Sequence, residues 1–298
     1  MKAVLIFVDG LGIGGSDPEI NPCLQPELNH LNHFFQSGQL VTSGSGYVLP
    51  LDATLDVAGL PQSATGQTAL LTGKNAALYL GKHLPGFPNQ ALRDLLKKHA
   101  LPKILKDRGC RPVFINAYRP EFFKLPQKLQ WRMSVTTIAN LSAGLPFKSL
   151  DEIKQSKAIY HDFTNRFLIR RGYDIPEWTP EAAGTVLAAL QNDYDFILYE
   201  YFLTDRIGHL MNAGKARQVV SDLDRFLSSF LAHVNLEDTL VIVTSDHGNI
   251  EDVSVKTHTR NPAMTLVFGK HSVELAAQMK SILDISPAIL RAFGDGDG

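Results

Sequence analysis

The chain is poor in features that mark several large classes of protein. Its 298 residues include two cysteines, Cys23 and Cys110, which lie far apart and lack the paired spacing of a zinc finger. A small secreted domain held by disulfides would carry more cysteines, so the sequence favours a reducing compartment, and we expect a cytoplasmic protein. No apolar run approaches the roughly 20 residues that a helix needs to cross a bilayer, so we expect no membrane partner.

The sequence also lacks an excess of charge of either sign. Its 29 Lys and Arg residues balance 30 Asp and Glu residues, for a formal net charge of −1. Nucleic-acid-binding proteins normally show a basic excess, so we expect no nucleic-acid partner. The apolar N-terminal segment 1–8 stops at Asp9-Gly10 without a small-residue cleavage pattern, and we interpret it as a strand rather than a signal peptide. The oligomeric state stays open.

Short apolar segments alternate with helical patterns over most of the chain. Strands are expected at 2–8, 112–117, 196–202, 240–243 and 264–268, with helices such as 101–109, 180–190 and 216–234 between them. This alternation predicts an α/β fold with a mostly parallel sheet sandwiched by helices. Apolar residues near helical spacing also predict a helix at 26–36.

One stretch interrupts the alternation. Residues 118–172 are rich in Arg, Lys, Phe and Trp, and we predict that they form a small cap inserted between two parts of one core, 1–117 and 173–298. Basic and aromatic residues suit an anionic substrate, although basic surface residues are more often simply solvated. The first candidates for contact with such a substrate are Arg119, Lys124 and Arg132.

Acids, imidazoles and one hydroxyl follow several of the expected strands. They are Asp9, Ser63, Asp205, His209, Asp246, His247 and His258. Each alone could be an ordinary helix cap, surface pair or loop residue. Ligands of open α/β sheets bind at the carboxyl ends of the strands, so the whole set at one edge indicates a site. Carboxylates and imidazoles in that number suit two divalent ions, Mn²⁺ or Zn²⁺ rather than Ca²⁺, which prefers all-oxygen sites.

The motifs that carry these residues resemble those of the alkaline phosphatase superfamily. The matching elements are Asp9-Gly10, Leu60–Gly66 (LPQSATG), Asp205–His209 (DRIGH), Thr244–Asn249 (TSDHGN) and His258–Pro262 (HTRNP). Within that superfamily they look most like the metalloenzyme core of cofactor-independent phosphoglycerate mutase and phosphopentomutase. The resemblance covers residues 1–75 and 175–298 and implies the alkaline phosphatase type of α/β fold.

The resemblance also implies roles for individual residues. One metal site would use Asp9, Asp246, His247 and the hydroxyl of Ser63, and a second would use Asp205, His209 and His258. Ser63 would be the nucleophile that forms a phosphoserine intermediate with a small phosphorylated substrate. Thr65 and Thr68 are nearby hydroxyls, but Ser63 stands in the position of the family's nucleophile.

Departures from the mutases favour hydrolysis of a phosphate ester. The segment between Gly73 and Leu101 is too short for the large phosphotransferase domain that mutases carry after the nucleophile, and Leu-Leu-Thr-Gly73 is closer to the nucleotide pyrophosphatase/phosphodiesterase branch. A sulfatase is disfavoured because its Cys/Ser-x-Pro-x-Arg pattern is missing. Two alternatives to a phosphatase or phosphodiesterase stay open. One is a phosphoglycerate mutase- or phosphopentomutase-like phosphomutase, and the other is a catalytically silent metal-binding scaffold.

Overall fold

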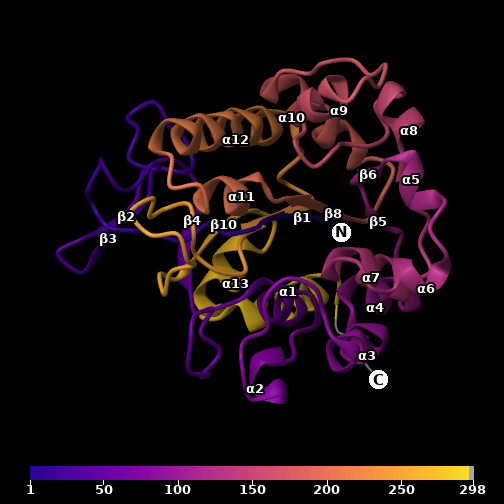
Figure 1. The fold of residues 1–298 in the computed structure, drawn as a ribbon, viewed down its shortest axis with the longest axis horizontal. Helices are drawn as coiled ribbons and strands as arrows, with labels where there is room; N and C mark the ends of the chain where they lie inside the picture. The colour runs from indigo at the N-terminus through magenta and orange to yellow at the C-terminus, as the bar shows by residue number, and fades with distance from the viewer. Residues whose placement is uncertain (295–298) are drawn as a thin grey trace.

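A six-stranded sheet forms the centre of the computed structural model, which describes residues 1–294 (Figure 1). The strands lie in the order β4 (Tyr47–Leu51), β10 (Ala263–Gly269), β9 (Thr239–Thr244), β1 (Lys2–Val8), β8 (Phe196–Tyr201) and β5 (Pro112–Phe114). Strand β1 pairs in parallel with β8 and β9, and β5 pairs in parallel with β8, whereas β10 runs antiparallel to both of its neighbours. The predicted α/β fold with a mostly parallel sheet is therefore confirmed.

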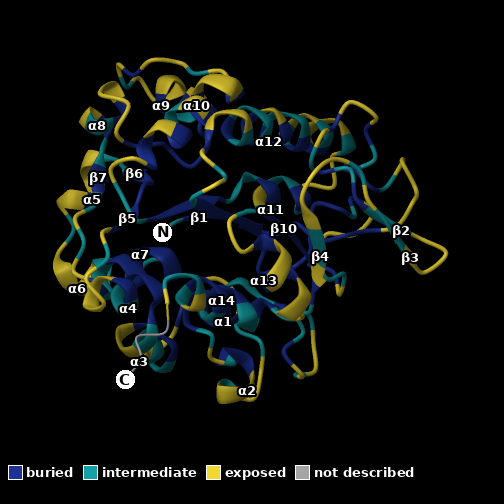
Figure 2. Cartoon of the chain, turned by 180° about the vertical axis from the view of Figure 1, so that it is seen from behind, coloured by how far each residue is buried: buried dark blue, intermediate teal, exposed yellow. Residues whose placement is uncertain are grey.

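Helices cover both faces of the sheet, so its strands are buried on two sides, except for the edge strand β4, most of whose residues are at least partly exposed (Figures 1 and 2). In β1, Leu5 and Phe7 point into one core and Val4 and Ile6 into the other, as the period of two in a strand requires. The first face is covered by α1 (Ser63–Thr72), α3 (Gln90–His99), α4 (Leu101–Asp107), α7 (Val135–Ser142), α13 (Ser272–Gln278) and α14 (Ile285–Ala292). The second is covered by α10 (Pro180–Leu190) and α12 (Ala213–His233).

The helix expected at 26–36 is absent, and that prediction is wrong. Residues 26–33 form turns, and a hairpin of β2 (Phe34–Gln36) and β3 (Gln39–Val41) follows them. The apolar side chains of Leu28 and Leu31 are buried as the spacing suggested. Their backbone is held differently, because the carboxylate of Asp224 on α12 accepts the backbone N–H groups of residues 29, 30 and 31 at 2.7–2.9 Å.

The segment 118–172, predicted as a cap, contributes to three cores, since Ile159 and Phe163 lie in the core on the second face of the sheet. Helix α7 packs against α3 and α4 in the main core. The other elements of the region are β6 (Ala117–Tyr118), α5 (Pro120–Phe123), α6 (Gln127–Gln130), β7 (Lys148–Ser149), α8 (Leu150–Lys154) and α9 (Arg166–Arg170). A separate small cluster joins Ile153 of α8 and Leu168 of α9 to Ala117. The domain boundaries stay a prediction, and residues 295–298 of the predicted core lie outside the described residues.

The remaining elements are short and join the main layers. They are α2 (Ala76–Leu80), α11 (Leu203–Gly208) and a 3₁₀ helix (Ile282–Asp284). Within residues 1–294, none of the helices is both long enough and apolar enough to pass through a bilayer. Helix α11 follows β8 directly, and this placement carries residues 203–209 to the carboxyl end of the central strands.

We predict that Asp224→Ala destabilises the protein strongly, because three backbone N–H groups then lose a charged acceptor in a buried position. The expected loss in free energy of unfolding is about 2–4 kcal/mol, measured by urea denaturation. Asp222→Ala on the same helix is the control, since its carboxylate accepts a hydrogen bond from the exposed Gln218 at 3.0 Å and pairs with the exposed Arg225 at 3.4 Å and Arg166 at 3.7 Å. Such a pair contributes less than about 1 kcal/mol. Equal losses in the two variants would contradict the proposed role of Asp224.

Candidate functional site

The predicted site residues meet at the carboxyl ends of β1, β8 and β9. Asp9 follows β1, Asp246 and His247 follow β9, and Asp205 lies on α11 just after β8. Gly10 brings two of these strands' ends together: its φ is +71°, and a Cβ atom there would lie 2.9 Å from the Cβ atom of Asp205. Only glycine combines that conformation with such a close approach.

Asp9, Asp246 and His247 form a first cluster of possible metal ligands. One ligand atom from each lies within 4.8 Å of the others, and all three side chains are buried. His247 Nε2 lies 3.4 Å from Asp9 Oδ1 and 3.4 Å from Asp246 Oδ2. The cluster therefore joins residues more than 230 positions apart in the sequence through the pairing of β1 with β9.

Asp205, His209 and His258 form a second cluster. Asp205 Oδ1 lies 3.3 Å from Nε2 of both histidines. The Nδ1 atoms face backbone carbonyls, that of His209 at 2.7 Å from Lys256 O and that of His258 at 2.8 Å from Pro61 O. A carbonyl can only accept, so Nδ1 carries the proton and the lone pair of Nε2 points at the centre of the cluster. The rings of His247 and His258 stack at 3.8 Å, so the two clusters are adjacent.

Both clusters fit a divalent cation. Tetrahedral bonds of about 2.0–2.1 Å place neighbouring ligand atoms about 3.3–3.4 Å apart. This matches the distances from His247 Nε2 to the two carboxylates of the first cluster and from Asp205 Oδ1 to the two histidines of the second. In the first cluster, Asp9 Oδ1 and Asp246 Oδ2 are buried without a hydrogen-bond partner. Burial and the neighbouring carboxylates raise the pKa of Asp9 well above its usual range and that of Asp246 to about 7. A bound cation would replace the missing partners and offset this repulsion.

Ser63 is the hydroxyl that the structure brings to the first cluster. It is the first residue of α1, and its Oγ lies 3.1 Å from His247 Nε2. The hydroxyls of Thr65 and Thr68 instead donate to backbone carbonyls of the same segment, at 3.1 and 2.7 Å. Gly66 allows α1 to approach this closely, because a Cβ atom there would lie 2.8 Å from the backbone oxygen of Asp246.

Several supporting residues were missed in the sequence. Gln67 donates to Asp9 Oδ2 at 3.1 Å, and Asn249 donates to Asp205 Oδ1 at 2.7 Å. The buried carboxylate of Glu251 accepts bonds from Gly12 N, Asn249 N and Asn261 Nδ2 at 2.7–3.0 Å, and thereby ties three loops together. The sequence could have indicated Gln67 as a supporting residue, since it lies four residues after Ser63 on the same face of the helix. Nothing local in the sequence marks Glu251.

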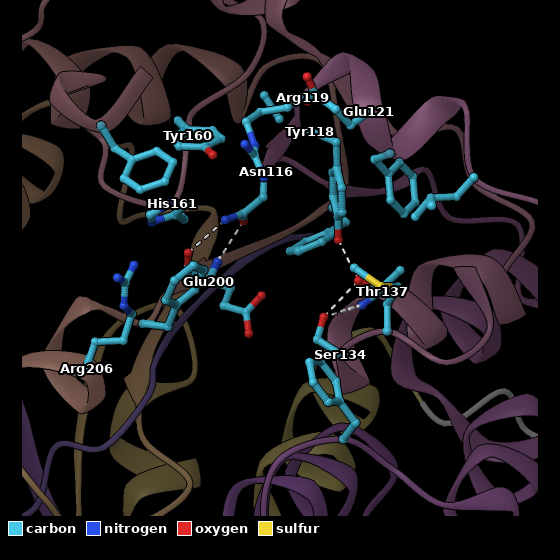
Figure 3. A pocket seen from close by; sticks show the side chains of 18 residues that line it. Asn116, Tyr118, Arg119, Glu121, Ser134, Thr137, Tyr160, His161, Glu200 and Arg206 are labelled. Carbon is cyan, nitrogen blue, oxygen red and sulfur yellow. Dashed lines mark hydrogen bonds between the residues drawn. The ribbon is translucent and has the colours of Figure 1, made fainter. Parts of the chain in front are cut away.

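A pocket of about 410 Å³ reaches Glu200 and Arg206, which are close to the clusters, although none of the cluster residues lines it (Figure 3). Arg206, which follows Asp205, lines it, as does Glu200 of β8. Burial raises the pKa of Glu200 to about 7, and its charge is one of those that raise the pKa of Asp9. Of the three basic residues predicted to contact substrate, Arg119 lines this pocket, whereas Lys124 and Arg132 are not among its lining residues.

A family comparison matches the part of the chain that supplies most of these ligands. Residues 176–295 match the model of the metalloenzyme superfamily. The 2,3-bisphosphoglycerate-independent phosphoglycerate mutase of Wolinella succinogenes is 28% identical over 130 residues, and that of Clostridium kluyveri is 31% identical over 132. Each match covers 41% of this chain and 26% of the relative. The matched stretch thus spans about a quarter of the length of these curated relatives.

Solved structures share the fold over nearly the whole chain. A protein from Pyrococcus horikoshii aligns with a TM-score of 0.59 at 16% identity, covering 100% of this chain and 98% of its own. The alkaline phosphatase of the Antarctic bacterium TAB5 aligns with a TM-score of 0.56 at 14% identity, covering 98% and 97%. At such low identities these likenesses concern the fold alone, and they agree with the predicted alkaline phosphatase type of architecture.

We predict that His161 in the pocket wall makes stability fall in acid. Burial and the charges of Arg206 and Arg119 lower the pKa of His161 to about 3. Its folded-state pKa lies below the unfolded value of about 6.5, so the unfolded chain binds the proton first as pH falls, and stability is lost below about pH 6.5. Between pH 7.5 and 5 the loss from this group is about 2 kcal/mol.

His161→Phe tests this prediction. The imidazole stacks on Phe202 with ring centroids 4.2 Å apart, so a phenyl ring can occupy the same place. Urea denaturation of both proteins at pH 7.5 and pH 5 should show a smaller acid loss in the variant, by about 2 kcal/mol. The same acid loss in both proteins would mean that the pKa of His161 is not lowered in the folded state.

Proposed function

Because this chain is a metalloenzyme of the alkaline phosphatase superfamily, we propose that it transfers the phosphoryl group of a small phosphate ester to Ser63 and then to water. The single observation that carries this proposal is the position of Ser63 Oγ, 3.1 Å from Nε2 of His247 in the first cluster of possible ligands. A serine hydroxyl is a weak nucleophile near neutral pH, so it needs an activating environment of this kind.

The residues that would hold two divalent ions are those of the two clusters. Asp9, Asp246 and His247, with Ser63 Oγ, would hold one ion. The second would be held by Asp205, His209 and His258. Carboxylate and imidazole donors suit Zn²⁺ or Mn²⁺. Such ions lower the pKa of a bound hydroxyl and stabilise negative charge on phosphoryl oxygens.

The chain's own groups supply the nucleophile and its surroundings. Ser63 Oγ attacks phosphorus, the Oγ–P bond forms and the bond from phosphorus to the ester oxygen breaks. The hydroxyl proton of Ser63 is lost to solvent, and the leaving alcohol takes up a proton in its place. Ser63 opens α1, whose first N–H groups and dipole favour the developing negative charge. Water then cleaves the phosphoserine to restore Ser63 and release phosphate.

The short segment that follows the nucleophile helix favours hydrolysis over phosphomutase chemistry. Helix α1 ends at Thr72 and α3 begins at Gln90, and between them the chain forms only the short helix α2. The curated mutase relatives are about four times as long as the stretch they share with this chain. A phosphoglycerate mutase- or phosphopentomutase-like activity is the alternative that those relatives suggest. A silent metal-binding scaffold is less well supported, since all predicted ligand positions and Ser63 are present.

We predict about two divalent metal ions per chain in protein purified without chelator, since each cluster has a complete donor set. Elemental analysis after dialysis measures the content. Asp246→Asn and Asp205→Asn should each lower it to about one, because each removes a charged ligand from one cluster. Asp174→Asn is the control, since Asp174 is fully exposed and pairs only with Lys154. A metal-free and fully active enzyme would refute the assignment.

We predict that Ser63→Ala lowers turnover of phosphate esters on the order of 10³-fold or more while metal stays bound. Thr68→Val, on the same helix and of the same shape, is the control and should keep its turnover. Inorganic phosphate released from a panel of phosphomonoesters and phosphodiesters supports hydrolysis. Isomerised phosphoglycerate or sugar phosphate supports a mutase, and silence with several metals supports the scaffold. Full activity of Ser63→Ala would exclude Ser63 as the nucleophile.

A further inference from the structure

The pocket beside the metal clusters is walled mainly by aromatic rings. Tyr118 packs on Phe122 with centroids 4.2 Å apart, and on the facing wall His161 stacks on Phe202 at the same distance (Figure 3). Phe87 also lines the pocket, although its side chain is 63% exposed. These rings come from four separate parts of the chain, so the wall is a product of the tertiary fold.

Two charged residues of the pocket, Glu200 and Arg206, lie next to the metal clusters, whereas Arg119 and Glu121 line another part of the wall (Figure 3). Glu200 precedes Asp205 by five positions, and Arg206 follows it directly. Strand pairing places Glu200 opposite Phe7. Because side chains alternate along a strand, Asp9, two residues after Phe7, is expected on the same face of the sheet. A ligand that spans this site would therefore place a charged end at the clusters and an apolar end among the rings.

Several of the polar groups in the wall are already engaged within the protein. The side chain of Asn116 donates to the backbone oxygen of Glu200 at 2.8 Å, and the hydroxyl of Tyr118 lies 2.7 Å from that of Thr137. Thr136 donates to Glu200 Oε2 at 2.7 Å. Apart from the charged groups of Arg119, Glu121, Glu200 and Arg206, the surface that the pocket offers to a ligand is chiefly the faces and edges of rings, which attract other flat rings.

We propose that this pocket binds the alcohol part of the phosphate ester, and that this part carries a flat ring. The inference rests on the proposed function, because it places the phosphoryl group at the metal clusters. The bond changes are those of the transfer to Ser63: the Oγ–P bond forms, the bond to the ester oxygen breaks, and the ring-bearing alcohol leaves protonated. A volume of about 410 Å³ accommodates one ring system with a short linker.

Three esters of matched reactivity test the ring directly: ethyl phosphate, 2-cyclohexylethyl phosphate and 2-phenylethyl phosphate. All are esters of primary alcohols with similar acidity, so differences in kcat/KM report binding in the transition state. We expect the phenyl ester to exceed the ethyl ester about tenfold or more and to exceed the cyclohexyl ester clearly. Equal kcat/KM values for the phenyl and cyclohexyl esters would contradict the preference for a flat ring. Equal kcat/KM values for all three esters would contradict binding of the alcohol part in the pocket.

Phe87→Ala provides the matched variant. Because Phe87 is largely exposed, its truncation spares the core, and the ratio of kcat/KM for the phenyl and ethyl esters should fall several-fold. The control is Tyr79→Ala, since Tyr79 is 62% exposed and lies outside the pocket. Its ratio should match that of the unaltered protein. An unchanged ratio in Phe87→Ala, or the same fall in Tyr79→Ala, contradicts the proposal.

A binding measurement separates this inference from the proposed function. Propylphosphonate and 3-phenylpropylphosphonate replace the ester oxygen by carbon and cannot be hydrolysed, so calorimetric titration of zinc-loaded protein needs no turnover. Tighter binding of the phenyl compound, weakened in Phe87→Ala, supports the ring pocket even if no ester is hydrolysed and the proposed function fails. Turnover of ethyl phosphate with equal affinity for both phosphonates leaves the proposed function standing and rejects the ring pocket.

Discussion

The architecture of this protein depends on holding three carboxylates together at one edge of the sheet, two of which, those of Asp9 and Asp246, are buried. The ends of β1 and β9 and the start of α11 bring Asp9, Asp246 and Asp205 to one edge of the sheet. Burial and mutual repulsion raise the pKa of Asp9 and Asp246, so the arrangement is costly as it stands. A fold keeps such a cost when something else in the site offsets it, and divalent cations do so most directly. The surrounding structure can be understood as the means of holding these acids in place.

Two kinds of restraint hold them. Close backbone approaches at Gly10 and Gly66 fix the distances between strand ends and helix α1, because no larger residue fits there. The carboxylate of Glu251, which is not itself in either cluster, joins the loops after β1 and β9 through charged hydrogen bonds. Such bonds are roughly twice as strong as neutral ones, so the loops that carry the ligands behave as part of the rigid core.

The sequence predicted the parts of the molecule that obey local rules. Strand periodicity gave the sheet, and the motifs around Asp9 and Asp246 indicated the metal-binding edge, because strand ends determine where such residues meet. The helix prediction at 26–36 is wrong. The apolar residues there have helical spacing, but backbone N–H groups of the segment bond to Asp224, a partner nearly 200 positions away. The same reason hid Glu251 and the division of segment 118–172 among three cores. Long-range partners leave no local pattern, so they become visible only once the chain is folded.

This difference also explains why the chemistry of the protein is easier to infer than its substrate. Most of the candidate ligands directly follow β1 and β9 or lie at α11, and His258 lies in the loop before β10, so their positions follow from the central sheet. The pocket wall combines loops and short helices with residues of β5, β6 and β8, and its rings are brought together by packing rather than by sequence spacing. Glu200 and Arg206 link the two regions, since each lies within a few residues of Asp205 while lining the pocket. A change of substrate in this architecture therefore requires changes in the ring-lined wall, whereas the metal-binding edge of the sheet can stay as it is.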